Sequence, residues 1–197
     1  MQLRSVFIVT LLLIWPFLAG CESQTRPTAI GLHEAALTGN VEAVQHHLAA
    51  GSDLNARDEY GSTPLIVAST FGRTEVARAL IVAGADLQAG NSDGSSPLHI
   101  ASFLCYPEIV AVLLEHGADP NATNANGTTP LQGVMGPFDA VKGIYDAIGG
   151  ALSPLGLQLD YDRIRATRPV VADMLRAAEE ESRRNDGEPT IDETAQG

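Results

Sequence analysis

Cysteine, aromatic residues and positive charge are all scarce in this chain. Its 197 residues include 2 Cys and 1 Trp, and aromatic residues make up 5% of the total. With 12 Lys and Arg against 24 Asp and Glu, the formal net charge is −12 at pH 7. The shortage of aromatics argues against a large round core. The shortage of Lys and Arg disfavours nucleic-acid binding, which needs clustered cations, and favours a protein partner with a basic surface.

Two short motifs return at a fixed interval of 33 residues. The first is Thr/Ser-Pro-Leu, found at Thr63-Pro64-Leu65, Ser96-Pro97-Leu98 and Thr129-Pro130-Leu131, with a degenerate copy at Ile30-Gly31-Leu32. The second is Gly-x-Asp, found at Gly51-Ser52-Asp53, Gly84-Ala85-Asp86 and Gly117-Ala118-Asp119. Self-similarity at this period indicates a repeat architecture.

The motifs resemble those of ankyrin-repeat proteins. Ser96-Pro97-Leu98-His99-Ile100-Ala101 nearly spells the Thr-Pro-Leu-His-x-Ala pattern of that family. The resemblance covers roughly residues 29–135 and 168–180. It implies an all-α solenoid of about four helix pairs joined by hairpin-like loops. It says less about function, because one fold serves many partners.

The residues of one unit explain why it would form a helix pair. Thr63 is a favoured N-cap, and Pro64 fits the first helical position, where its missing N–H has no cost. Gly72 is suited to a left-handed helix end. Leu80 and Leu113, one period apart, should lie in the core shared by neighbouring units, because one pair cannot bury its apolar face alone.

We predict four segments along the chain. A lipoprotein signal peptide spans residues 1–20, a tether 21–28, the ankyrin-repeat domain 29–181 and a disordered acidic tail 182–197. The repeats are 29–61, 62–94, 95–127 and 128–181, and the fourth contains an insertion at about 137–165.

The N-terminal segment resembles a bacterial lipoprotein signal. Arg4 precedes an apolar run over residues 6–18, and Leu18-Ala19-Gly20-Cys21 resembles the lipobox, in which the Cys is acylated and becomes the mature N-terminus. The resemblance implies lipidation at Cys21 and a periplasm-facing protein. Glu22 favours the outer membrane by the same analogy. The alternatives are an ordinary secretory signal or a single membrane anchor.

Cys105 has no disulfide partner if Cys21 carries lipid. It falls where earlier repeats have Gly39 and Gly72. A left-handed Cys there costs about 1–2 kcal/mol, unless the turn is remodelled. We expect a buried, inert thiol, because no sequence neighbour activates it; a redox or nucleophilic role is the alternative.

The histidines suggest structure rather than metal binding. His46 and His47 are adjacent, so on a helix they point about 100° apart and chelate poorly, whereas a spacing of four would suit a metal. We therefore expect them to belong to a polar end repeat. His33 and His99 occupy the motif His, for which the resemblance implies hydrogen bonds between repeats.

The loop tips are the first candidate for partner binding. The resemblance places these tips on the concave binding face, and Tyr is a favoured interface anchor. The candidates are Asp58, Glu59, Tyr60, Asn91, Asp93 and Asn126. Asp-Gly and Asn-Gly pairs also favour tight turns, so the alternative is that these residues only make turns.

The insertion is the rival binding site. Apolar spacing predicts a helix near residues 138–149, followed by an irregular segment to 168 and a helix resuming at Pro169. The candidate contacts here are Tyr145, Tyr161 and Arg163.

No sequence motif points to catalysis, a cofactor or a metal. P-loop, Gly-x-Ser-x-Gly, His-Glu-x-x-His and Cys-x-x-Cys patterns are missing. Asp160 and Asp162 would share a direction only on a strand. We therefore predict a lipid-anchored protein-binding module. One alternative is an immunity protein that neutralises an envelope-targeted toxin, and a second is an enzyme with its site in the insertion.

Overall fold

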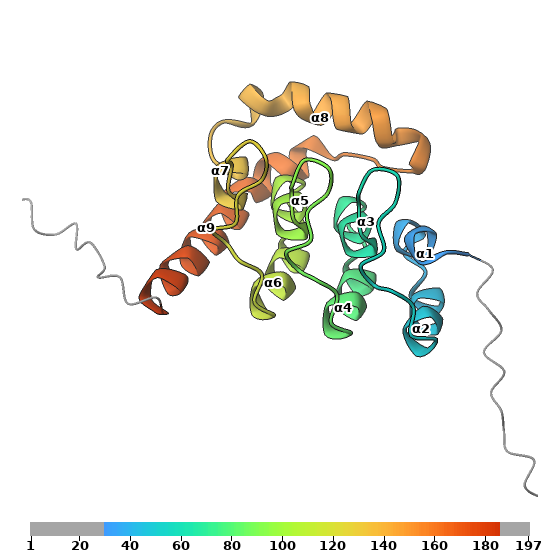
Figure 1. The fold of residues 1–197 in the computed structure, drawn as a ribbon. Helices are drawn as coiled ribbons and strands as arrows, with labels where there is room; N and C mark the ends of the chain where they lie inside the picture. The colour runs from blue at the N-terminus through green and yellow to red at the C-terminus, as the bar shows by residue number, and fades with distance from the viewer. Residues whose placement is uncertain (1–29, 186–197) are drawn as a thin grey trace, which may run out of the picture.

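The computed structural model describes residues 30–185, which form a stack of helices with no strand among them. Figure 1 shows the helix pairs side by side, with α8 (Phe138–Leu152) lying across their upper end. The pairs are α1 (Leu32–Thr38) with α2 (Val41–Ala49), α3 (Pro64–Thr70) with α4 (Thr74–Val82), α5 (Pro97–Phe103) with α6 (Pro107–Glu115), and α7 (Pro130–Val134) with the later part of α9 (Tyr161–Asn185). The predicted all-α solenoid is confirmed.

The first helix of each later pair begins where its sequence dictates. The hydroxyls of Thr63, Ser96 and Thr129 each accept a hydrogen bond from the backbone N–H three residues further on. A proline occupies the next position in all three helices. These N-caps satisfy donors that have no partner within the helix, so the repeated triplet fixes where each pair starts.

Both helices of each pair contribute to the core, and the second helices do so at the same register positions in successive repeats. Two such columns are almost completely buried: Ala43, Val76, Ile109 and Val171, then Leu80, Leu113 and Leu175. In the first repeat, His47 takes the Leu position. Its ring nitrogens lie 3.0 Å from the Ser52 hydroxyl and 3.0 Å from the Ile30 carbonyl. A polar residue therefore replaces leucine at the end of the stack.

Two histidines tie one repeat to the next. The Nε2 atom of His33 lies 3.0 Å from the Ser62 carbonyl, and the Nε2 atom of His99 lies 3.0 Å from the Thr128 carbonyl. Burial lowers the pKa of His99. The neutral ring is therefore favoured, and it can accept from Ser96 while donating to the next loop. The expected inter-repeat role of these histidines is confirmed.

The fourth repeat carries α8 (Phe138–Leu152) and a short 3₁₀ turn η1 (Ser153–Leu155). The predicted helix near 138–149 is present and runs slightly longer. The predicted restart at Pro169 is wrong, because α9 begins at Tyr161 and contains Pro169. Asp160 accepts the Arg163 N–H at 3.0 Å, so it caps the helix at this earlier point.

The C-terminal boundary also needs correction. Residues 182–185 belong to α9, whereas the sequence predicted a disordered tail from 182. Residues 186–197 lie outside the described part of the chain, as do the signal peptide, the tether and Cys21. What the sequence predicts for these segments therefore stays a prediction. Between residues 30 and 185, none of the helices combines the length and the apolarity needed to cross a bilayer.

Candidate protein-binding surface

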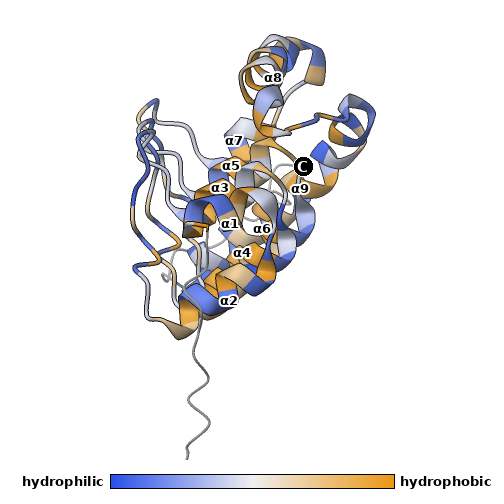
Figure 2. Ribbon diagram, turned by 90° about the vertical axis from the view of Figure 1, so that its right-hand side faces the viewer, coloured by the Kyte–Doolittle hydropathy of each residue, from blue (hydrophilic) through white to orange (hydrophobic). Residues whose placement is uncertain are grey.

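The loops between helix pairs project together from one side of the stack. Figure 2 shows them as a row on the side away from α8. The Ser92 hydroxyl donates to the Tyr60 carbonyl at 2.6 Å, and the Ala125 N–H donates to the Asp93 carbonyl at 2.9 Å. Each tip is thus bonded to the next, so the row forms a continuous surface.

The leading residue of each tip makes the turn. Asp58 accepts the N–H groups of Tyr60 and Ser62 at 2.9 and 2.8 Å. Asn91 does the same for Asp93 and Ser95, both at 3.0 Å. A side chain that bonds its own backbone in this way stabilises a tight turn. The side chains of Asp58 and Asn91 therefore make the turns, which is the alternative to partner binding that the sequence left open.

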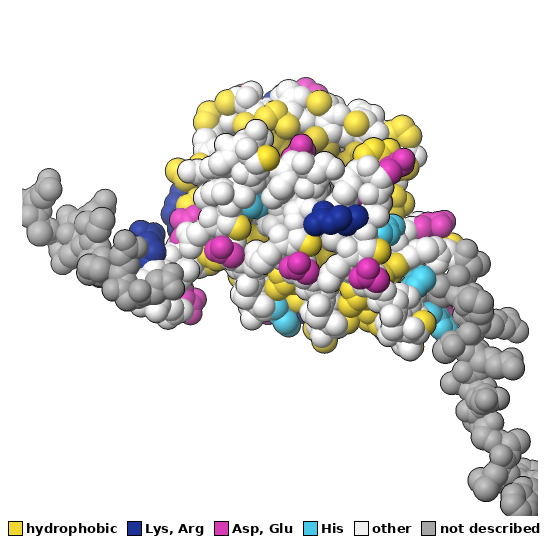
Figure 3. All heavy atoms as spheres, viewed as in Figure 1, with side chains coloured by type: hydrophobic (Ala, Val, Ile, Leu, Met, Phe, Trp, Pro, Cys, Tyr) yellow, Lys and Arg dark blue, Asp and Glu magenta, His cyan; other side chains and the backbone are white. Residues whose placement is uncertain are grey.

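The other tip candidates point their side chains to solvent. Glu59, Asp93 and Asn126 are exposed, and the Tyr60 side chain is the largest apolar group among them, with 67% of its surface exposed. Figure 3 shows Asp and Glu side chains spread over the face that carries the loops, where Lys and Arg are few. The tips therefore present an exposed aromatic ring among side chains that are mostly acidic, with Arg57 as a cation that donates to the Gly61 carbonyl in the same row.

Tyr145, a predicted partner contact, lies in the interior. It is fully buried, its hydroxyl donates to the Phe103 carbonyl at 2.5 Å, and its ring stacks on Phe103 at a centroid distance of 4.6 Å. The prediction for Tyr145 is wrong, because no surface of this side chain can reach another protein. It instead packs α8 onto the first helix of the third repeat.

Arg163 also serves the fold. Its guanidinium donates to the carbonyls of Leu104 and Cys105, the latter bond being short and the former 3.2 Å long, and it lies 4.9 Å from the Tyr106 ring centroid. These carbonyls follow directly after α5, whose C-terminal end carries partial negative charge. Arg163 is therefore corrected from a partner contact to an anchor of the insertion.

The turn that Arg163 binds has an unusual backbone conformation at Cys105. It is the one non-glycine residue with positive φ between residues 30 and 185, at 58°. The equivalent Gly39 and Gly72 have φ of 76° and 62°, so the turn keeps its left-handed shape without glycine. The thiol is fully buried, and burial raises its pKa. A protonated, enclosed thiol agrees with the expected inert role.

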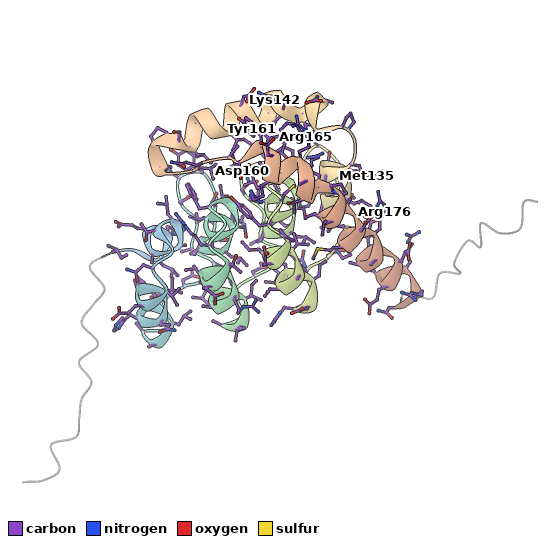
Figure 4. All side chains as sticks on the ribbon, turned by 180° about the vertical axis from the view of Figure 1, so that it is seen from behind. Met135, Lys142, Asp160, Tyr161, Arg165 and Arg176 are labelled. Atoms are coloured by element: carbon purple, nitrogen blue, oxygen red, sulfur yellow. The ribbon has the colours of Figure 1, made fainter. Side chains whose placement is uncertain are left out.

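Tyr161 joins α8 to α9 at the surface. Its hydroxyl donates to Asp146 at 2.8 Å, and the Lys142 ammonium lies 2.9 Å from the same carboxylate. The hydrogen bonds from Lys142 and Tyr161 lower the pKa of Asp146. Figure 4 shows Lys142 on α8 beside Tyr161 and Arg165 on α9. Tyr161 keeps an accessible edge, but its hydroxyl is engaged within the insertion.

Sequence reasoning missed Arg168. This residue is 4% exposed, and its guanidinium donates to the Tyr145 hydroxyl at 2.8 Å and to the Met135 carbonyl at 3.4 Å. No carboxylate pairs with it among residues 30–185. The signal was its spacing from Ile164 and Val171, which puts all three on one face of a helix.

These contacts cover part of the inner surface of the third repeat. A second apolar cluster joins α5 to the insertion and consists of Leu104, Cys105, Phe138, Tyr145 and Ile164, with Ile100, Phe103 and Tyr106 packed against it. A partner therefore cannot reach the end of α5 while α8 is in place. The tips of the loops stay open.

A family model that describes three copies of the ankyrin repeat matches residues 32–124. The chain contains ankyrin repeats. No curated protein matches the sequence. Ankyrin repeats generally mediate protein–protein interaction, and proteins built from them are typically non-enzymatic.

Proposed function

We propose that this protein is a lipid-anchored ankyrin module of a bacterial envelope that faces the periplasm and binds a basic protein through its loop tips. The main support for this binding surface is the row of loop tips joined by hydrogen bonds. In this row the Tyr60 side chain, next to Glu59, is 67% exposed. Aromatic anchors in the middle of a polar rim contribute strongly to interfaces. A rigid row also lowers the entropy lost on binding.

The choice of the tips over the insertion follows from how each side chain is used. Tyr145 and Arg163 are engaged within the protein. Glu59, Tyr60 and Asp93 extend into solvent. The insertion would then cover the end of α5 and leave only the loop side open to a partner. No catalytic step, cofactor, metal or nucleic acid enters this proposal.

The anchor and the compartment rest on the sequence alone. Leu18-Ala19-Gly20-Cys21 follows an apolar run, and Glu22 favours the outer membrane. A tether of residues 21–28 would hold the repeats close to the bilayer. A basic partner in the envelope would meet the acidic tips there, because opposite charge speeds encounter.

An immunity protein is a narrower form of the same proposal. Its partner would be a toxin whose basic active-site rim is masked by the acidic tips. The net charge of −12 favours this reading over a neutral partner.

Capture from an envelope extract tests the proposal. The mature chain is immobilised through its C-terminus, and bound proteins are identified by quantitative mass spectrometry. We expect one stoichiometric basic partner whose recovery falls in the Tyr60→Ala bait. Equal recovery on both baits would contradict binding through the tips. A toxin among the captured proteins would select the immunity reading.

A further inference from the structure

A groove of about 800 Å³ lies between α6 and α9 at the C-terminal end of the stack. Its apolar lining includes Leu114 from α6 and Met174 and Ala178 from α9, and Glu115, Asp119 and Glu181 lie along it. None of the loop-tip candidates lines it. The groove is therefore a second surface, separate from the one assigned above.

The extra length of α9 creates this groove. When Val76 of α4 is aligned with Val171 of α9, Val82 at the end of α4 aligns with Ala177. The helix α9 nevertheless continues beyond this position to Asn185. Figure 1 shows this end of α9 running past α6 and away from it. The Asn121 side chain donates to the Ser182 hydroxyl at 3.3 Å. The extension is thus attached to the loop after α6, and the groove lies beside that attachment.

The electrostatics of the groove favour a cation. Glu115, Asp119 and Glu181 are exposed, and none of the three forms an ion pair within residues 30–185. The helices α6 and α9 both end at the groove, and helix C-termini carry partial negative charge. Arg183 and Arg184 do not line it; each donates to a carbonyl of its own helix.

The chain offers no suitable occupant from its own C-terminal segment. Residues 186–197, which follow Asn185, contain Asp186, Glu188, Asp192 and Glu193 and no Lys or Arg. Like charges at close range repel. A segment of this composition is therefore disfavoured beside three unpaired carboxylates.

We propose that this groove docks a short segment of a partner protein that places an aliphatic side chain against Leu114 and Met174 and flanks it with Lys or Arg. The apolar lining supplies contact area, and the carboxylates select the flanking charge. The inference rests on the proposed function in that it takes a protein as ligand, but it uses a different surface. The two proposals can therefore fail separately.

Selection from a library of random 12-residue peptides displayed on phage, with the mature chain as bait, tests this docking site. We expect selected peptides to combine Leu, Ile or Val with Lys or Arg. Synthetic copies should lose affinity by at least about tenfold, or 1.4 kcal/mol, for the Ala177→Lys variant. That change adds bulk and positive charge to an exposed position in the groove.

Val82→Lys is the matched control, because Val82 holds the same register position in α4, is 70% exposed and lies outside the groove. It should leave peptide affinity unchanged. Failure to select basic aliphatic peptides, or equal binding by the Ala177→Lys variant, would overturn the docking site. Peptides that respond to Tyr60→Ala alone would overturn it while supporting the loop tips. A gain in affinity of about tenfold or more on removing residues 186–197 would name the chain's own tail as occupant and overturn the proposal.

Discussion

Arg163 donates a hydrogen bond to the backbone carbonyl of Cys105, 58 residues earlier in the chain. This contact joins the start of α9 to the only left-handed turn in the described repeats that lacks glycine. Because the same guanidinium also donates to the Leu104 carbonyl and lies over the Tyr106 ring, it holds the insertion to the third repeat through three contacts.

Replacing this anchor should destabilise the protein measurably. Arg163→Met removes hydrogen bonds from a charged donor, and we expect the free energy of unfolding to fall by about 1.5–3 kcal/mol. Arg165→Met is the control, because Arg165 is half-exposed and its ion pairs with Asp139 and Asp162 are at the surface, where such pairs contribute about 0–1 kcal/mol. Urea unfolding followed by circular dichroism compares the two. Equal losses would show that Arg163 contributes no more than a surface arginine.

Alkaline pH should loosen the insertion through Tyr145. Burial raises the pKa of Tyr145 to about 12, whereas an unfolded tyrosine titrates near pH 10. The folded state therefore holds the proton more tightly, and the stability it contributes is complete below pH 10 and is lost as the pH rises toward 12.

Urea unfolding between pH 8 and pH 12 measures this effect. Wild-type stability should fall more steeply above pH 10 than that of Tyr145→Phe, which cannot ionise. Tyr161→Phe serves as a comparison, since its hydroxyl bonds Asp146 at the surface. If the Tyr145→Phe protein loses stability as steeply as wild type, Tyr145 does not contribute to the alkaline transition.

Local patterns made the repeats predictable. The capping residues Thr63, Ser96 and Thr129 act on backbone groups three residues away, and the period of 33 aligns core positions such as Leu80 and Leu113. Each signal occurs several times, so the copies support one another.

The insertion was less predictable because it occurs once and is held by distant contacts. Tyr145 meets Phe103 across 42 residues, and Arg163 meets Cys105 across 58. No periodicity in a single sequence links such pairs. Both side chains consequently looked like surface candidates. The sequence predicted the start of α9 too late, because Pro169 is a strong helix-start signal. Ile164, which precedes that proline, already lies on the buried face of this helix.

Lipidation should depend on Cys21. The Cys21→Ser variant should stay unprocessed or become soluble, because the resemblance to a lipobox implies that the Cys21 thiol is the group that is acylated. Metabolic labelling with a fatty-acid probe, followed by fractionation of membranes, measures both outcomes. Cys105→Ala is the control and should keep its label. Label that persists in Cys21→Ser would exclude this residue as the anchor.

Binding to a captured basic partner is the most direct test of the loop-tip surface. We predict that Tyr60→Ala weakens the affinity by about 2 kcal/mol or more, as the loss of an aromatic anchor does, with an unchanged helical melting curve. Val82→Ala, which truncates an exposed apolar side chain away from the tips, should have no effect. Association should also slow on adding salt, because exposed charges are screened within about 10 Å at 0.1 M. Unchanged affinity for Tyr60→Ala together with salt-independent association would contradict binding of a basic partner through the loop tips.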